Sequence, residues 1–112
     1  MKSESFLNTI VEVIMDRPLG SKHPKYGYIY PVNYGYIKGI FSGDGEELDA
    51  YVLDEKLPLI KFKGRVIAII HRLNNDDDKL IVFKERKNIS DEQIKQLTYF
   101  QEKYFDSIII RR

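Results

Sequence analysis

Short apolar runs separated by turn residues recur along the chain as far as residue 85, and they constrain its fold more than any other feature. Such runs lie at residues 8–16, 48–54, 64–73 and 80–85, and Pro, Gly, Asn or Asp residues separate them. β-branched runs of this length are typical of strands. Residues 26–41 alternate aromatic residues with glycine, which indicates strands that bend or that a ligand approaches closely.

One segment near the C-terminus predicts a helix. Ser90 suits its N-cap, with Gln93 as the capping-box partner, and apolar residues recur at helical spacing from Ile94 to Tyr104. Residues 107–112 predict a short strand or an extended tail. Several short strands followed by one helix predict a mainly β, α+β fold, a small closed β-barrel with the helix packed outside. A length of 112 residues fits one domain, so we expect residues 1–112 to form a single barrel.

Charge and cysteine content exclude several classes of protein. The 18 Lys and Arg nearly balance the 17 Asp and Glu, so no strong field attracts nucleic acid or anionic lipid. The absence of cysteine excludes disulfides and thiolate metal sites. Glu4, Glu12 and Asp16 interrupt the apolar N-terminal stretch, which argues against a signal peptide or a membrane span. We therefore expect a cytoplasmic protein with neither a membrane nor a nucleic acid as its partner.

The stretch "SGDGEELDAYVLD", residues 42–54, concentrates acidic side chains where a glycine turn leads into a strand. If the strand begins near Glu47, then Asp44 and Glu46 lie in the turn and Asp49 points into the same space. Converging carboxylates repel one another unless a cation lies between them. Mg²⁺ prefers carboxylate oxygens and water, so the turn predicts a metal site, with a solvated hairpin as the alternative.

A second acidic stretch, "NNDDDKL", places Asp76, Asp77 and Asp78 in a turn between two apolar strands. Alone it fits an ordinary polar loop, but together the two turns resemble the carboxylate ring of a multi-metal phosphate site. Cations and phenols suit the outer oxygens of a metal-bound phosphate. The candidates for this role are Arg17, Lys22, Lys25, Lys79, Tyr34 and Tyr104.

The stretch "YPVNYGYI", separated by six residues from "DGEELDAYVL", resembles the soluble family I inorganic pyrophosphatases from about residue 16 to residue 104. The resemblance implies hydrolysis of pyrophosphate to two phosphates, with Mg²⁺ or Mn²⁺ as the metal, on a closed five-stranded OB-like β-barrel. It also implies a tendency to form homo-oligomers.

The resemblance also implies roles for individual residues. Asp44, Asp49 and Asp77 match metal ligands, and Glu46 acts with Asp49 in generating the attacking hydroxide. The residues that match the phosphate site are Arg17, Tyr34, Lys79 and Tyr104, and Lys22 or Lys25 replaces a lysine from the missing N-terminal region.

Several positions depart from the family pattern. Glu46 and Glu47 stand in place of Asp and Pro, Phe105 stands in place of a lysine, and the acidic ligand upstream of Asp77 has no clear match. Three alternatives therefore remain open: hydrolysis of a nucleotide phosphoanhydride, a catalytically impaired relative that binds metal or phosphate, and an OB-like module for single-stranded nucleic acid. The exposed aromatic run favours the last of these, whereas the two acidic turns disfavour it.

Overall fold

The computed structural model describes residues 2–74, 77–85 and 88–111. Its elements, in chain order, are η1 (Lys2–Phe6), β1 (Ile10–Arg17), β2 (Asn33–Phe41), β3 (Glu47–Val52), β4 (Lys61–Arg72), β5 (Asp77–Phe83), α1 (Asp91–Glu102) and β6 (Ser107–Ile110).

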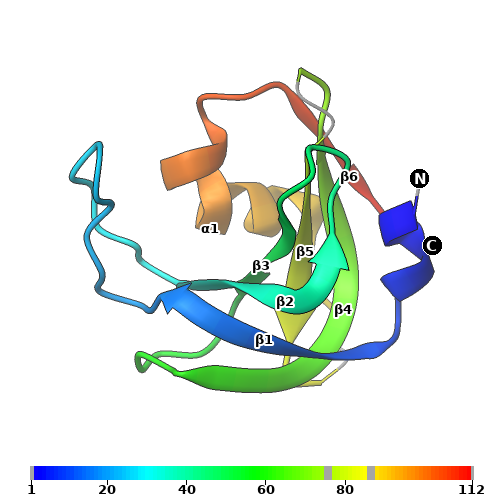
Figure 1. Ribbon diagram of the computed structural model, residues 1–112, viewed down its shortest axis with the longest axis horizontal. Coiled ribbons are helices and arrows are strands. Elements are labelled where there is room, and N and C mark those ends of the chain that lie inside the picture. The colour runs from blue at the N-terminus through cyan, green and yellow to red at the C-terminus, as the bar shows by residue number, and fades with distance from the viewer. Residues whose placement is uncertain (1, 75–76, 86–87, 112) are drawn as a thin grey trace.

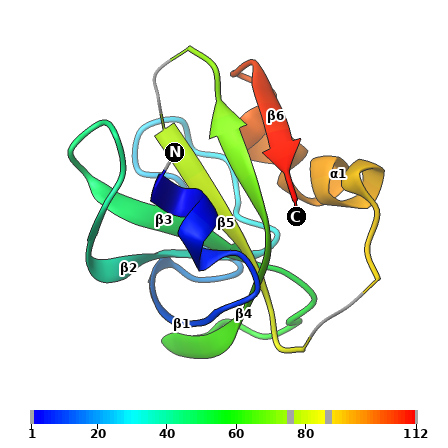
Figure 2. The same cartoon turned by 90° about the vertical axis from the view of Figure 1, so that its right-hand side faces the viewer.

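Five of the strands close into a barrel, as the sequence predicts. They follow the order β1-β2-β3-β5-β4, and pairing between β1 and β4 closes the ring. The pairing of β3 with β5 is parallel and the other pairings are antiparallel. β6 extends the sheet beyond the barrel by pairing with the second half of β4. Figures 1 and 2 show α1 on the outside of the barrel, which confirms the predicted architecture.

Side chains alternate between two apolar layers, one inside the barrel and one beneath α1. In β3, Leu48, Ala50 and Val52 pack into the interior cluster. Tyr51 points to the opposite face and packs with Ile94 of α1. β5 is buried on both faces, which explains its unbroken apolar run. Asp49 shares the outer face with Tyr51 because residues two apart on a strand point the same way, and Lys79 lies beside Asp49 as its register partner on β5.

Local signals determine where α1 begins. The Ser90 hydroxyl accepts a hydrogen bond from the Gln93 amide, and the Gln93 side chain accepts one from the Ser90 amide, so the predicted capping box is present. The helix ends at Glu102, earlier than its apolar spacing predicts, and Tyr104 lies in the turn that follows. Within the described ranges, no helix combines the length and the apolar character that crossing a membrane requires.

The second acidic stretch differs from its prediction. Asp77 and Asp78 belong to β5 and are buried, rather than lying in a solvated turn. Asp76 falls outside the described residues. Pairing with β4 extends β5 to Asp77, opposite Arg72, and places Asp78 opposite His71. The tertiary partners therefore lengthen the strand beyond its apolar run.

Candidate active site at the end of the barrel beneath the helix

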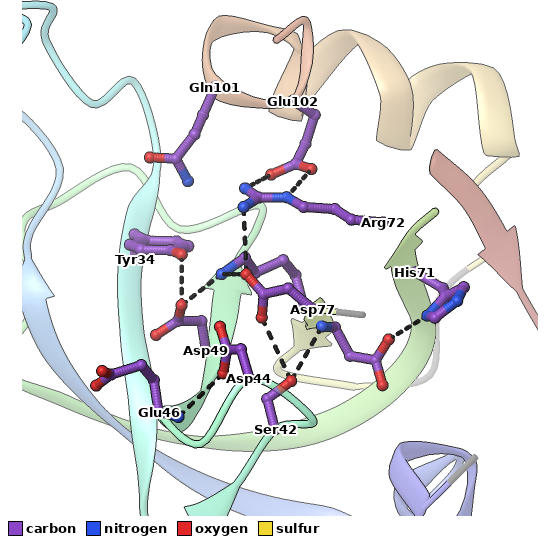
Figure 3. Close-up of polar contacts among 12 residues, drawn as sticks. Tyr34, Ser42, Asp44, Glu46, Asp49, His71, Arg72, Asp77, Gln101 and Glu102 are labelled. Carbon is purple, nitrogen blue, oxygen red and sulfur yellow. Dashed lines mark hydrogen bonds and ion pairs between the residues drawn. The ribbon is translucent and has the colours of Figure 1, made fainter. Parts of the chain in front are cut away.

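Lys79 links two of the predicted metal-binding carboxylates. Its Nζ lies 2.5 Å from Oδ2 of Asp49 and 2.8 Å from Oδ2 of Asp77. Asp49 is the register partner of Lys79 across β3 and β5, and Asp77 lies two residues before Lys79 on the same face. The Lys79 side chain is almost completely buried, so its ammonium group depends on these carboxylates for compensation. The register of two strands thus builds the centre of the site (Figure 3).

Tyr34 lies next to this pair and fixes one oxygen of Asp49. The Tyr34 hydroxyl donates to Oδ2 of Asp49 at 2.9 Å. Burial, reinforced by the negative charge of Asp49, raises the pKa of Tyr34 well above its ordinary value. The phenol therefore stays protonated at neutral pH and acts as a donor. Asp49 uses Oδ2 for both its Tyr34 and its Lys79 contacts.

Arg72 is a buried cation that the sequence does not single out. Its Nη1 lies 3.2 Å from Oδ2 of Asp77, and its Nε and Nη2 donate to the two carboxylate oxygens of Glu102 at 2.9 and 2.7 Å. The ring centroid of Phe105 lies 3.7 Å from the guanidinium carbon. Burial opposes the charged form, but the hydrogen bonds and charge of Glu102 prevail and raise the pKa of Arg72. This guanidinium is a permanent positive charge.

Hydrogen bonds attach the C-terminal turn of α1 to the barrel around Arg72. The Tyr51 hydroxyl donates to Oε2 of Glu102 at 2.6 Å and accepts from Nε2 of Gln101 at 2.7 Å. The Tyr30 hydroxyl donates to Oε1 of Gln101 at 2.8 Å. Burial, followed by the charge of Glu102, raises the pKa of Tyr51 well above its ordinary value. The helix end is therefore positioned by a buried polar network.

The turn before β3 brings Asp44 toward the cluster of Asp49, Asp77 and Lys79 but leaves Glu46 outside this cluster. Gly45 adopts a positive φ of 85°, and Oδ1 of Asp44 accepts a hydrogen bond from the Glu46 amide at 3.0 Å. In Figure 3 the Asp44 carboxyl group points toward Asp49, whereas that of Glu46 points away from Asp44 and Asp77. Both turn carboxylates are exposed. The Ser42 hydroxyl joins the turn to β5 by donating to Oδ1 of Asp77 at 3.3 Å.

A bulge at the end of β1 presents Asp16 and Arg17 to the same region. The register shifts between Met15 and Arg17, which sets Arg17 opposite Tyr34 and makes Asp16 the extra residue. Burial, followed by the negative charge of Asp49, raises the pKa of Asp16 although Arg17 opposes the shift. In the described part of the chain, Nε of Arg17 is a buried side-chain donor without a hydrogen-bond partner.

Three predicted phosphate-binding residues lie outside the cluster. Lys22 and Lys25 are exposed on the loop between β1 and β2, which extends away from the barrel in Figure 1. Nζ of Lys25 lies 5.3 Å from the ring centroid of Tyr26, on the same loop. Tyr104 is 62% exposed beyond the end of α1. Their assignment to phosphate stays a prediction.

The structure adds functional candidates that sequence reasoning did not select. They are Asp16, Ser42, Arg72, Gln101 and Glu102. The sequence contains one indication for Arg72, which is a charged residue at the end of the most apolar strand. A charged residue in such a position needs a buried partner. Glu102 and Gln101 resemble ordinary polar positions on a helix, and only the packing of α1 places them over the barrel.

The donor set at the mouth of the site fits a hard divalent cation. Asp44 is exposed and the side chain of Asp49 is 28% exposed, so both keep oxygens within reach of a hydrated ion. Mg²⁺ is usually held by one or two carboxylates and retains several waters. Among the described residues, no three carboxylate or imidazole side chains converge closely enough to hold a metal ion between them. The residues therefore suit a largely hydrated ion at Asp44 and Asp49.

Carboxylates, cations and phenolic donors gathered at one end of a closed barrel are the groups that a charged, metal-bound phosphorylated ligand requires. The sequence profile of the inorganic pyrophosphatase family matches residues 11–109, so the chain belongs to that family.

Individual relatives agree with this assignment. The chain is 28% identical to an inorganic pyrophosphatase of Geobacillus stearothermophilus over 91% of its own length and 80% of the relative's. It is 33% identical to one from Malacoplasma penetrans, over 68% of its own length and 50% of the relative's. The crystal structure of the Ehrlichia chaffeensis inorganic pyrophosphatase superposes with a TM-score of 0.72 at 16% identity, covering 94% of this chain and 87% of that one. This last likeness shows a shared fold.

Proposed function

We propose that the chain hydrolyses inorganic pyrophosphate to two phosphates and uses Mg²⁺ as its metal. The observation that carries the proposal is the buried Nε of Arg17, which has no partner among the described residues. Leaving a buried donor unsatisfied is costly, and an oxygen of a bound phosphate would satisfy it. Arg17 lies opposite Tyr34 in the pairing of β1 with β2, and the Tyr34 hydroxyl donates to Asp49, which supports a place for Arg17 beside the same site.

Five residues of the site have a chemical task in this reaction. Water adds to one phosphorus while the bond from that phosphorus to the bridging oxygen breaks, and the departing phosphate receives a proton. Mg²⁺ bound by Asp44 and Asp49 would supply an activated water and screen the negative charge of the substrate. Arg17 and Lys79 would bind phosphoryl oxygens, and the protonated Tyr34 would hold Asp49 in position. Mn²⁺ is expected to substitute for Mg²⁺.

The base that receives the proton of the attacking water is assigned to Glu46, following the family resemblance. Its carboxylate points away from Asp77, so this role requires rotation of a side chain that is free to rotate because it is exposed. The cytoplasmic location and the homo-oligomer stay predictions, as do the phosphate contacts of Lys22, Lys25 and Tyr104.

Phosphate release from pyrophosphate and Mg²⁺ tests the proposal directly. We expect turnover by the wild-type chain and its loss in Asp49→Asn, whereas Glu12→Gln, on the exposed face of β1, should retain the wild-type rate. A wild-type rate no higher than that of Asp49→Asn would refute the proposal. Parallel reactions with nucleoside di- and triphosphates test the alternative phosphoanhydrides, since faster release from a nucleotide would change the substrate class.

A further inference from the structure

Both oxygens of Asp77 already have protein partners, in contrast to those of Asp49. Oδ2 of Asp77 contacts Nζ of Lys79 at 2.8 Å and Nη1 of Arg72 at 3.2 Å, and its Oδ1 accepts from the Ser42 hydroxyl at 3.3 Å. The residue is 6% exposed. Asp49 is more exposed and directs both of its contacts to Oδ2, so within the described ranges its other oxygen has no protein donor. The two aspartates therefore differ in their capacity to bind a metal.

Arg72 is fixed in place and unable to withdraw from Asp77 without a penalty elsewhere. Two of its nitrogens form a bidentate pair with Glu102, and the Phe105 ring stacks on its face. Movement of the guanidinium toward solvent would leave the carboxylate of Glu102 buried without its cation, which is strongly unfavourable. A divalent ion that approaches Asp77 would also meet the positive charges of Arg72 and Lys79 at close range, in surroundings that screen them weakly.

We propose that Arg72 and Lys79 are internal cations that take the place of a metal ion on Asp77. Resting on the proposed function, this inference assigns the binding of divalent metal in the free protein to Asp44 and Asp49. Asp77 then positions Lys79 and Arg72 instead of coordinating metal. The chain accordingly binds fewer divalent ions than its carboxylates suggest, because part of the positive charge of the site is built into β4 and β5.

Mn²⁺ binding without substrate tests this assignment, measured by titration calorimetry and by the electron paramagnetic resonance signal of free Mn²⁺. Asp49→Asn should lower the Mn²⁺ affinity by about tenfold or more, since even the loss of a group that only orients a metal ligand costs that much. Asp77→Asn should keep an affinity close to that of the wild type. An equal loss in both variants would overturn the proposal. Failure to hydrolyse pyrophosphate would count against the proposed function alone, since no substrate is present here.

Removing Arg72 gives an independent test of whether the internal cations replace a metal ion on Asp77. This test also applies if Asp77→Asn fails to fold. The double variant Arg72→Met/Glu102→Leu removes the buried pair together and avoids leaving either charge alone. It leaves Asp77 with Lys79 as its one remaining cationic partner among the described residues. We expect tighter Mn²⁺ binding or an additional Mn²⁺ ion per chain, and unchanged Mn²⁺ binding would overturn the proposal.

Discussion

Replacing Arg72 with Met should destabilise the protein far more than its single charge suggests. The change removes both hydrogen bonds to Glu102 and the contact with Asp77. Glu102 is 8% exposed and keeps only the Tyr51 hydroxyl as a donor among the contacts of the site. Breaking a buried ion pair by removing one partner costs about 3–5 kcal/mol. A domain has a total stability of about 5–15 kcal/mol, so this loss is a large part of it.

Urea unfolding followed by far-ultraviolet circular dichroism provides the measurement. With a denaturant slope of about 2 kcal/mol per molar for a small domain, a loss of about 4 kcal/mol lowers the midpoint by about 2 M. The double variant Arg72→Met/Glu102→Leu should recover most of this loss, because no buried charge remains without compensation. It should stay about 1 kcal/mol below the wild type, since the Tyr51 hydroxyl loses its acceptor.

Arg111→Met supplies the matched control. Nη1 of Arg111 lies 2.8 Å from Oδ1 of Asp91, close to the distance between Arg72 and Glu102, but this pair is exposed. Exposed ion pairs contribute at most about 1 kcal/mol to stability. The two variants should therefore differ in stability because of burial and not because of the distance between the charges. Burial would not explain the loss if Arg72→Met costs no more than Arg111→Met, or if the double variant is no more stable than the single one.

Three further predictions concern the turn, the bulge and the β1–β2 contact. Glu46→Asp should raise kcat for pyrophosphate, by up to about 10²-fold if the longer side chain misplaces the base, and a lower kcat would contradict this. Burial raises the pKa of Asp16 above its ordinary 3.8. The Asp16 carboxyl group therefore stabilises the folded protein below pH 3.8, and this stabilisation is lost as the pH rises through the pKa that the group has in the folded protein. Asp16→Asn should therefore melt at a higher temperature than the wild type at pH 7 and lose this advantage on acidification, and a difference independent of pH would exclude the mechanism. Gly35→Ala should lower the free energy of unfolding in urea by about 3 kcal/mol, since its Cβ would lie 2.0 Å from the Ile14 carbonyl oxygen. Gly39→Ala, at a φ of 78° in open space, should lower it by about 1–2 kcal/mol. Equal losses in the two variants would contradict the steric explanation.

The elements of the fold were largely predictable because their signals are local. The run at residues 64–73 predicts β4, and the Ser90 and Gln93 pair predicts the start of α1, since strand patterns and helix caps depend on neighbours in sequence. The predicted polar turn before residue 80 was wrong because strand pairing outweighs the local polarity of the sequence there. Asp77 and Asp78 read as a polar turn, but their pairing with Arg72 and His71 incorporates them into β5.

The sequence by itself determined a barrel followed by a helix, the acidic turn at Asp44 with Asp49 on the strand that follows it, and the family to which the chain belongs. Only the tertiary structure decided which charges meet. The parallel register of β3 and β5 sets Lys79 beside Asp49, and the packing of α1 places Glu102 on Arg72. Turns and caps are specified by residues adjacent in the chain, whereas an ion pair forms between residues that folding brings together. Residues 72 and 102 lie 30 positions apart, so the pairing of Arg72 with Glu102 is not apparent until the chain is folded.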